Sequence, residues 1–203
     1  MMSTGLKKAP DHLKNIHVMI VDNDQKIIAI IVRVLQCFGF RNIFEARDGF
    51  SAVETLRQHD IDLIITDWEL LPLKQHDIYD LPSNPVVRSD QWSPVMPKDG
   101  ACFVKYIRLS KYSPNPFVPV IMVTGLGLRG HIEYARDAGV NEIILKPLTI
   151  ENLCERISMV IDRPRCFVTS ASYKGPCRRR ERAALKGQAE RRKHDVKLFK
   201  HTA

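Results

Sequence analysis

The sequence lacks the features that would tie it to a membrane, to secretion or to a zinc site. Its longest apolar run, Ile27 to Val32, is far too short to cross a bilayer. No charged segment followed by an apolar one opens the chain, so we expect no secretory signal. The 5 cysteines are odd in number, scattered and without a Cys-x-x-Cys pair: Cys37, Cys102, Cys154, Cys166 and Cys177. This usage argues against a disulfide framework and fits a reducing cytoplasm, where we place the protein.

The chain also lacks an excess of charge except at its C-terminal end. The net charge is +8 over 203 residues. Residues 162–203 hold 13 Lys or Arg and 4 Asp or Glu, whereas the remaining 161 residues hold 18 basic and 19 acidic ones. Any attraction to nucleic acid or to an anionic surface therefore belongs to the C-terminal end.

Buried-strand and amphipathic-helix patterns alternate between residues 15 and 162. Short apolar runs predict strands, and apolar residues at helical spacing predict the helices between them. The predicted strands are 16–21, 40–46, 61–67, 118–124 and 142–145. The predicted helices are 27–38, 50–59, 99–111, 132–138 and 150–161. The alternation predicts an α/β domain with a five-stranded parallel sheet and helices on both faces.

Polar residues stand at the ends of four predicted strands. Asp22 and Asn23 follow the first strand, Asp67 ends the third, Thr124 ends the fourth and Lys146 follows the fifth. An Asp at a strand end can simply break the strand, so Asp67 alone decides nothing. Because the carboxyl ends of parallel strands meet at one edge of a sheet, however, we expect these side chains to lie together.

This set of groups suits phosphoryl chemistry. An Asp carboxylate such as Asp67 can attack a phosphoryl group if its negative charge is managed. Mg²⁺ manages that charge by bridging the carboxylate and the phosphate oxygens, and acidic residues after the first strand would hold the metal. Lys146 can pair with phosphoryl oxygens, and Thr124 can donate its hydroxyl hydrogen to them.

Four motifs resemble the receiver domain of bacterial two-component response regulators. In chain order they are Ile-Val-Asp22, Ile-Ile-Thr-Asp67-Trp68, Ile-Met-Val-Thr124-Gly125 and Ile-Leu-Lys146-Pro147. The resemblance covers residues 15–162 and implies a flavodoxin-like fold. It also implies a phosphoprotein of phosphorelay signal transduction, which acts by protein contact and not as an enzyme. The donor would be a histidine kinase or a phosphotransfer protein, and the downstream protein partner is unknown.

The resemblance assigns roles to individual residues. Asp67 would carry the aspartyl phosphate, and Thr124 and Lys146 would sense it. The implied Mg²⁺ ligands are Asp22, Asn23, Asp67 and the main-chain carbonyl of Glu69. A cis peptide before Pro147 is implied, which the low cost of cis before proline permits. Such domains often pair through the face of the fourth and fifth strands, so a homodimer is a further expectation.

The first departure from the family is at Asn23, where receivers usually have a second acidic residue that binds the metal. An amide oxygen can coordinate Mg²⁺ but brings no charge. A unit charge pair at ~4 Å is worth about 4 kcal/mol at an effective dielectric of ~20, and desolvation returns part of it. We therefore expect metal affinity to be lowered at least tenfold. Asp24 could substitute, although its expected role is to cap the first helix.

Two further departures concern a loop and a strand. Residues 96–100 resemble the turn that follows the third strand in the family, but here an insertion at 71–95 separates them from that strand. The insertion either covers the site, carries a partner-binding segment or is a tolerated surface insertion. The aromatic switch residue of the family corresponds to Ile143. A relay from Thr124 would therefore use an aliphatic side chain.

The two ends of the chain are expected to lie outside the receiver domain. Residues 1–14 are predicted to be flexible and residues 163–203 to be a basic tail, of which 178–200 could form a marginal helix. The stretch from Arg163 to Arg180 resembles a tail found on some bacterial stand-alone receivers. Residues 178–200 are either a solvated charge run or a weak contact to nucleic acid or an anionic surface, and the salt dependence of binding would separate the two. The chain leaves no room for a winged-helix output domain, so we expect a stand-alone receiver.

Two rival functions compete with a phosphorylated receiver. One is a degenerate receiver that binds partners without phosphorylation, since Asn23 weakens the site. The other is a phosphatase of the haloacid dehalogenase type, because Asp22-Asn-Asp24 fits its Asp-x-Asp nucleophile motif. That family needs an acidic pair near the last strand, whereas the next acidic residues here, Glu151 and Glu155, lie on a predicted helix.

Overall fold

The structure confirms the predicted α/β architecture. The computed structural model describes residues 11–70, 99–170 and 173–178. Its 5-stranded sheet is parallel and has the order β2-β1-β3-β4-β5, the strand order of the flavodoxin-like fold. The strands are β1 (His17–Val21), β2 (Asn42–Ala46), β3 (Leu63–Asp67), β4 (Val120–Thr124) and β5 (Glu142–Leu145).

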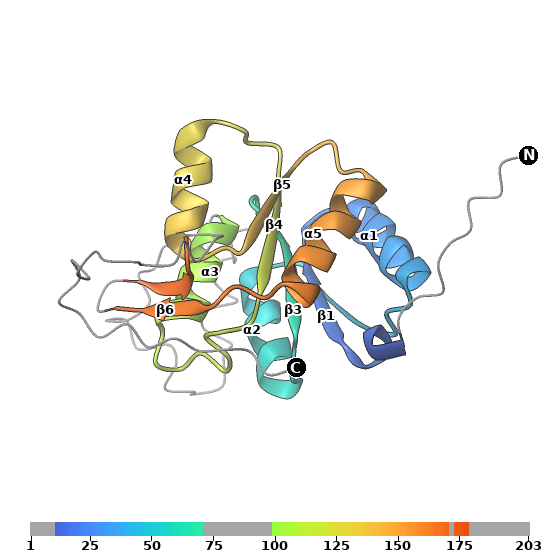
Figure 1. Cartoon of the computed structure of the whole chain (residues 1–203), viewed down its shortest axis with the longest axis horizontal. Coiled ribbons are helices and arrows are strands. Elements are labelled where there is room, and N and C mark those ends of the chain that lie inside the picture. The colour runs from blue at the N-terminus through green and yellow to red at the C-terminus, as the bar shows by residue number, and fades with distance from the viewer. Residues whose placement is uncertain (1–10, 71–98, 171–172, 179–203) are drawn as a thin grey trace, which may run out of the picture.

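Helices cover both faces of the sheet, and a short 3-10 helix, η1 (Asp11–Asn15), precedes it. The α-helices are α1 (Gln25–Phe38), α2 (Gly49–Gln58), α3 (Gly100–Leu109), α4 (Arg129–Ala138) and α5 (Ile150–Asp162). Helices α1 and α5 pack on one face, and α2, α3 and α4 pack on the other (Figure 1). Within the described parts of the chain, no helix is long and apolar enough to span a membrane.

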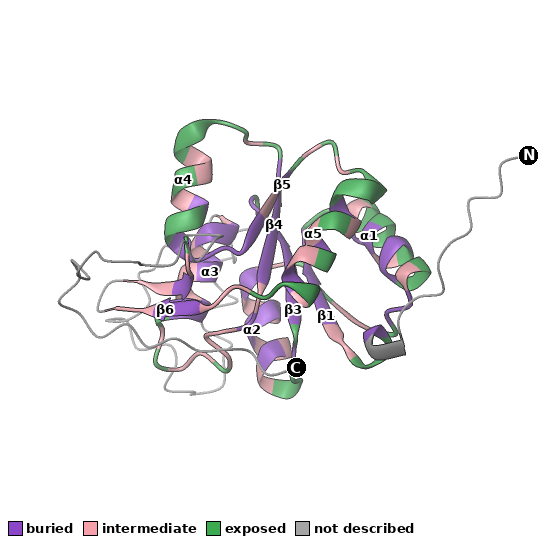
Figure 2. Cartoon of the chain, in the orientation of Figure 1, coloured by how far each residue is buried: buried purple, intermediate pink, exposed green. Residues whose placement is uncertain are grey.

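The two helical layers bury the middle of the sheet completely. Every residue of β3 and of β4 is buried, as expected for parallel strands covered on both faces. Figure 2 shows the central strands buried and the outer surfaces of the helices exposed, most clearly on α4. Side chains inside the sheet therefore serve packing, and polar chemistry is left to the ends of the strands.

Capping side chains determine where most helices leave the sheet. Asp24, Asp48, Asp99 and Thr149 each accept a hydrogen bond from a main-chain N–H of the first turn, and so cap α1, α2, α3 and α5. Asp24 thus has the capping role predicted for it. The predicted cis peptide between Lys146 and Pro147 is present as well.

The observed boundaries differ from the predicted ones in places. Helix α4 begins at Arg129 and not at residue 132, because its first turn brings no apolar residue to the periodic pattern. Strand β2 begins at Asn42, after a buried Phe40 that belongs to the core. The predicted insertion at 71–95, residues 96–98 of the family turn and the possible helix beyond Arg178 lie outside the described residues.

The C-terminal part of the described chain folds back as an antiparallel hairpin that the sequence did not predict. Strands β6 (Phe167–Thr169) and β7 (Lys174–Pro176) pair to form a separate 2-stranded sheet. Both lie within residues 163–203, where only a basic tail was expected. Strands this short show no alternation, and the Gly-Pro pair in β7 is normally a turn signal.

Two glycines allow the hairpin to lie directly against the main sheet domain. Gly139 ends α4 with a φ of 99°, and a Cβ there would lie 2.8 Å from the carbonyl oxygen of Lys174. At Gly175, a Cβ would lie 2.9 Å from the Cα of Gly139. Any side chain at either position would therefore push the hairpin away.

A buried arginine of α3 lies beneath this hairpin. Arg108 donates from Nε and Nη2 to the carbonyl oxygen of Gly139 at 3.2 and 3.1 Å, and from Nη1 to that of Pro116 at 2.9 Å. Its Nη2 also reaches Asn141 Oδ1 at 3.3 Å, and the Phe167 ring centroid lies 5.0 Å from its Cζ. Burial lowers the pKa of Arg108 from 12.5 to about 9, so the group is still charged at neutral pH. Among the described residues no carboxylate pairs with Arg108, so neutral acceptors and a ring hold a buried cation.

We expect Arg108→Met to lower the free energy of unfolding by about 2–4 kcal/mol, because the carbonyls of Gly139 and Pro116 would stay buried without a donor. Urea denaturation measures the change. Arg129→Met is the matched control, since that side chain is 91% exposed and pairs only across the surface with Glu133. If the two variants are equally stable, Arg108 does not hold the hairpin side of the domain.

Candidate functional site

Neighbouring strands place polar residues side by side at the carboxyl edge of the sheet. Val21 of β1 pairs in register with Thr66 of β3, so Asp22 and Asp67, one residue further on, are adjacent. Asp67 in turn pairs with Val123 of β4. Since parallel strands lie ≈ 4.8 Å apart, the two carboxylates share one small region of the edge.

Lys146 reaches Asp67 from the far side of β4. Its Nζ lies 3.1 Å from Asp67 Oδ1, while its main-chain N–H donates to the carbonyl oxygen of Thr124 at 2.8 Å. The Asp67 side chain is only 6% exposed, and that of Lys146 is 31% exposed. Among the described residues, this largely buried carboxylate has one ammonium partner, Lys146.

The main chain orients the same carboxylate oxygen. Asp67 Oδ1 accepts a hydrogen bond from the N–H of Trp68 at 2.8 Å in addition to the contact from Lys146. Two donors on a single oxygen fix the plane of the carboxylate. The other oxygen, Oδ2, is left available to an electrophile that enters the edge.

Asp22 is buried more deeply than its partner. It is 1% exposed, and its Oδ1 accepts from the N–H of Asp24 at 2.8 Å. Burial raises the pKa of Asp22 above its ordinary 3.8, and the negative charge of Asp67 adds to the rise, against the Asp24 hydrogen bond and Lys146. The site thus holds two buried carboxylates and one ammonium, a balance that favours an additional cation.

The remaining predicted site residues differ in burial. Thr124 is 2% exposed, and its Oγ1 accepts from the N–H of Leu126 at 2.9 Å, which leaves the hydroxyl hydrogen for another acceptor. Asn23 and Glu69 are exposed at the same edge, directly after Asp22 and Trp68. The structure therefore brings Asp22, Asp67, Thr124 and Lys146 together as buried or half-buried groups, with Asn23 and Glu69 at the rim.

The start of α3 closes the site from the side of the family turn. The N–H of Gly100 donates to the carbonyl oxygen of Trp68 at 2.5 Å, and a Cβ on Gly100 would lie 2.1 Å from the carbonyl oxygen of Asp67. Only glycine permits this approach of the main chain. Sequence reasoning matched the Asp99-Gly100 pair to the turn but assigned it no steric role.

Trp68 connects the site to α4, which sequence reasoning also missed. Its ring is 7% exposed and meets that of His131 edge-on, with the centroids 5.2 Å apart. The Tyr134 ring lies 6.0 Å away, and the Tyr134 hydroxyl lies 3.4 Å from Cys102 Sγ of α3. Ile143 of β5 packs against the apolar cluster that contains Trp68 and residues of α3 and α4, so these elements share one core with the residue that follows Asp67.

The donor set suits Mg²⁺ better than a transition metal. Asp22 and Asp67 offer carboxylate oxygens, and no thiolate or imidazole was predicted or found among the edge groups. No cluster of three or more His, Cys, Asp or Glu that could hold a metal occurs within 11–70, 99–170 and 173–178. Mg²⁺ needs no such cluster, since one or two carboxylates, waters and substrate phosphates complete its shell.

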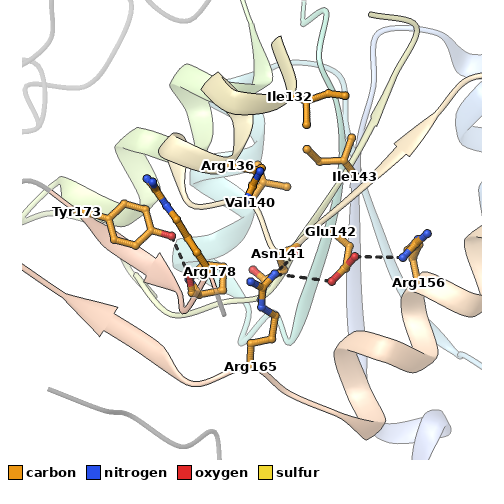
Figure 3. A pocket seen from close by; sticks show the side chains of 11 residues that line it. Ile132, Arg136, Val140, Asn141, Glu142, Ile143, Arg156, Arg165, Tyr173 and Arg178 are labelled. Carbon is orange, nitrogen blue, oxygen red and sulfur yellow. Dashed lines mark hydrogen bonds and ion pairs between the residues drawn. The ribbon is translucent and has the colours of Figure 1, made fainter. Parts of the chain in front are cut away.

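A pocket of about 430 Å³ lies at the opposite, amino end of β5, between α4, α5 and the hairpin. Figure 3 shows Glu142 between Arg156 and Arg165, whose nearest nitrogens lie 3.4 and 3.8 Å from its carboxylate oxygens. Arg136 and Arg178 also line this pocket, so its lining is strongly positive. The pocket is remote from Asp67 and contributes nothing to the carboxylate edge.

Comparison with known proteins identifies the class of this domain. The profile of the response regulator receiver domain matches residues 18–74. The chemotaxis protein CheY of Pseudomonas aeruginosa is 30% identical over 146 residues, which make up 72% of this chain and 96% of that protein. CheY-3 of Vibrio cholerae is 29% identical over 150 residues, 74% of this chain and 95% of its own length.

Solved structures show the same fold. CheY4 of Vibrio cholerae superposes with a TM-score of 0.53 at 23% identity, over 71% of this chain and 98% of that one. The receiver domain of the Francisella response regulator 1452 superposes with a TM-score of 0.55 at 21% identity, over 74% and 100%. The fold is thus that of CheY and of receiver domains. The chain belongs to the response regulator receiver family, whose members serve phosphorelay signalling in two-component systems.

The raised pKa of Asp22 predicts the pH dependence of stability. In the pH window between its ordinary value of 3.8 and the raised value, the folded state keeps a proton that the unfolded state has lost. The stability that Asp22 contributes is therefore present in acid and is lost as pH rises through the folded-state pKa. We expect Asp22→Asn to raise the free energy of unfolding at neutral pH by about 0.5–2 kcal/mol, with the gain disappearing in acid.

Urea denaturation at a series of pH values measures this effect. Asp48→Asn is the control, because it removes the same charge from a helix cap that Asn fills equally well. An Asp22→Asn variant that is less stable than the native protein at neutral pH would show that the Asp22 charge is not a cost to the fold.

Proposed function

We propose that this protein is a receiver that accepts a phosphoryl group on Asp67 from a histidine kinase or a phosphotransfer protein. The observation that carries the proposal is the 3.1 Å contact between Lys146 Nζ and Asp67 Oδ1 at an edge shared with Asp22 and Thr124. Membership of the receiver family supports the same chemistry.

Asp67 acts as the nucleophile through Oδ2. Lys146 and the N–H of Trp68 hold Oδ1, so the carboxylate keeps one orientation while Oδ2 forms the new bond to phosphorus. The bond from phosphorus to the donor nitrogen or oxygen breaks as this bond forms, and the departing group takes a proton from solvent. Burial of the edge limits the access of water to the acyl phosphate.

Mg²⁺ is the cofactor that the donor set fits. Asp22 and Asp67 would hold it with their carboxylates, and the Asn23 amide and the Glu69 carbonyl would complete the protein ligands. When bound, the ion neutralises charge on the carboxylates and on the incoming phosphoryl oxygens. The receiver domain of the sensor histidine kinase PA1611 from Pseudomonas aeruginosa has a magnesium ion coordinated in its active-site cleft, which supports this assignment.

Lys146 and Thr124 would respond to the phosphoryl group once it is on Asp67. The ammonium can transfer from Asp67 Oδ1 to a phosphoryl oxygen, and the Thr124 hydroxyl can donate to another. Both residues end or follow strands beside α4, so their movement would reach the surface that a protein partner contacts. We assign output to that contact, without enzyme activity, in the cytoplasm.

A second candidate is a receiver that works without phosphorylation. Exposed Asn23 stands where the resemblance expects an acidic metal ligand, so the edge has two carboxylates and not three. In this case the fold would present its partner surface constitutively.

Phosphoryl labelling tests the acceptor directly. We expect incubation with acetyl phosphate and Mg²⁺ followed by borohydride trapping to place the adduct on Asp67, located by peptide mass spectrometry. Asp67→Asn should remove the adduct, and Lys146→Met should reduce its yield by at least about tenfold, because the ion pair that orients the carboxylate is lost.

The alternatives give different labels. An adduct on Asp22 would favour a phosphatase nucleophile, and a protein that stays unlabelled with every donor would favour the phosphorylation-independent receiver.

Asn23→Asp tests the weakness of the metal site. We expect about tenfold or tighter Mg²⁺ binding and faster labelling, because the variant adds a full charge next to Asp22. Quenching of Trp68 fluorescence in a Trp92→Phe background reports Mg²⁺ binding. Gln25→Glu is the matched control, since it adds the same charge nearby, on a side chain that contacts Glu45 and Arg47 and not the metal site. Equal affinities in Asn23→Asp and the native protein would exclude the amide as the cause of weakness.

A further inference from the structure

Two cysteines face each other across the base of the C-terminal hairpin. The ladder pairs Phe167 with Pro176, and the next step outward pairs Cys166 with Cys177. The N–H of Cys177 donates to the carbonyl oxygen of Cys166 at 2.7 Å, which continues the ladder past the end of the strands. Directly opposed residues of an antiparallel pair project on the same face, so both thiols lie on one side of the hairpin.

The spacing of such a pair suits a disulfide. Opposed residues of a hydrogen-bonded antiparallel pair have their Cα atoms ≈ 5.5 Å apart, and disulfides usually join residues with Cα separations of ≈ 4.4–6.8 Å. Both cysteines are free and half-buried, so solvent-borne reagents can reach them. The Cα separation is therefore within the range of a disulfide, and only a local tightening of the hairpin is needed to join the sulfur atoms.

The other cysteines have no such partner in the described structure. Cys37, Cys102 and Cys154 lie on three different helices, α1, α3 and α5. Burial raises the pKa of Cys154 to about 11 and also raises that of Cys102, which lowers their thiolate fraction. Cys37 is exposed and single on its helix, so it is the residue to remove as a source of links between molecules.

We propose that Cys166 and Cys177 are a redox-sensitive pair that forms a reversible intramolecular disulfide, closing the C-terminal hairpin at its base. The oxidant is a low-molecular-weight disulfide of the glutathione type. One cysteine thiolate attacks it and releases one thiol, and the second cysteine then displaces the other thiol from the mixed disulfide. The protein loses two protons and two electrons, and the oxidant becomes two thiols.

The geometry of the pair makes this disulfide easy to reduce, so it would be reversible and not a permanent structural bond. The Cβ atoms of opposed residues lie ≈ 4.5–5.5 Å apart and are closest in pairs that are not hydrogen-bonded, whereas a disulfide requires ≈ 3.5–4.5 Å. The hairpin must therefore tighten at a hydrogen-bonded position, which makes the bond easier to reduce. Labile bonds of this kind are the ones that sense redox state in a reducing compartment.

The cysteine pair lies beside the arginine-lined pocket at the start of β5. Arg165 donates from Nε to the carbonyl oxygen of Cys177 at 3.0 Å and from Nη1 to that of Asn141 at 3.1 Å, so the base of the hairpin is tied to the start of β5. Arg178, next to Cys177, ion-pairs with Asp137 of α4 and lines the arginine-rich pocket. Oxidation would hold the hairpin wall of this pocket, and the point where the basic C-terminal stretch begins, in one position.

Thiol counting on the full chain tests the pair. In the Cys37→Ser background, equilibration with oxidised glutathione should lower the mass of the intact protein by about 2 Da. Alkylation under denaturing conditions should then show a loss of two free thiols. Peptide mapping without reductant should join the peptides of Cys166 and Cys177, and dithiothreitol should restore both thiols. Cys102→Ser and Cys154→Ser should form the same bond, while Cys166→Ser and Cys177→Ser should not.

Hydrogen exchange tests the consequence for the hairpin. The amide of Val168 should exchange about tenfold more slowly in the oxidised than in the reduced protein, because closing the base suppresses local opening. The amide of Ile65 in β3 serves as the internal control and should be unaffected. The proposal is overturned by an unchanged thiol count, by a bond to Cys102 or Cys154, by stable glutathione adducts on either hairpin cysteine, or by unchanged exchange at Val168.

Discussion

The contact between Asp67 and Lys146 depends on the order of the strands. β3 and β5 are not neighbours, because β4 lies between them, so the lysine must span a whole strand to reach the carboxylate. Thr124 ends the strand between them, and its hydroxyl accepts a hydrogen bond from the N–H of Leu126. The strand order therefore determines which charged side chains can meet at the edge.

At this edge the negative charge of the carboxylates is only partly balanced by positive charge. Two buried carboxylates share one half-buried ammonium, and the raised pKa of Asp22 expresses the imbalance. A bound Mg²⁺ would relieve part of that cost, because its positive charge offsets the two carboxylates. An exposed Asn23 in place of a third acid reduces both the cost in the free protein and the attraction for the metal. Asn23 therefore favours the stability of the free protein and disfavours metal binding.

The opposite edge of the sheet is built on a different principle. There a buried guanidinium, Arg108, is held by carbonyl oxygens and by the Phe167 ring, and the hairpin closes over it through paired glycines. The charge of Arg108 helps to attach the hairpin to the domain, whereas the charges of Asp67 and Lys146 belong to the proposed phosphoryl site. The two edges are joined by β5, which begins at the pocket of arginines and ends beside Lys146.

Most of the fold was predictable, because hydrophobic periodicity and strand-end residues carry it. The parallel sheet, its helices, the cap at Asp24 and the cis peptide before Pro147 all followed from the sequence or from its family resemblance. The hairpin did not, since three-residue strands leave no periodic signal. The steric role of Gly100 and the packing of Trp68 on α4 also escaped, because they depend on distances between segments that no local pattern encodes.

The most direct test of the account is an amide NMR titration with Mg²⁺ and then phosphoramidate, performed on the full chain. The first and largest shifts should fall at the carboxyl ends of β1, β3, β4 and β5, on Asp22, Trp68, Thr124 and Lys146. The hairpin amides should respond less. Shifts that instead centre on the arginine pocket, or a spectrum unchanged by both reagents, would contradict a phosphoryl-accepting edge at Asp67.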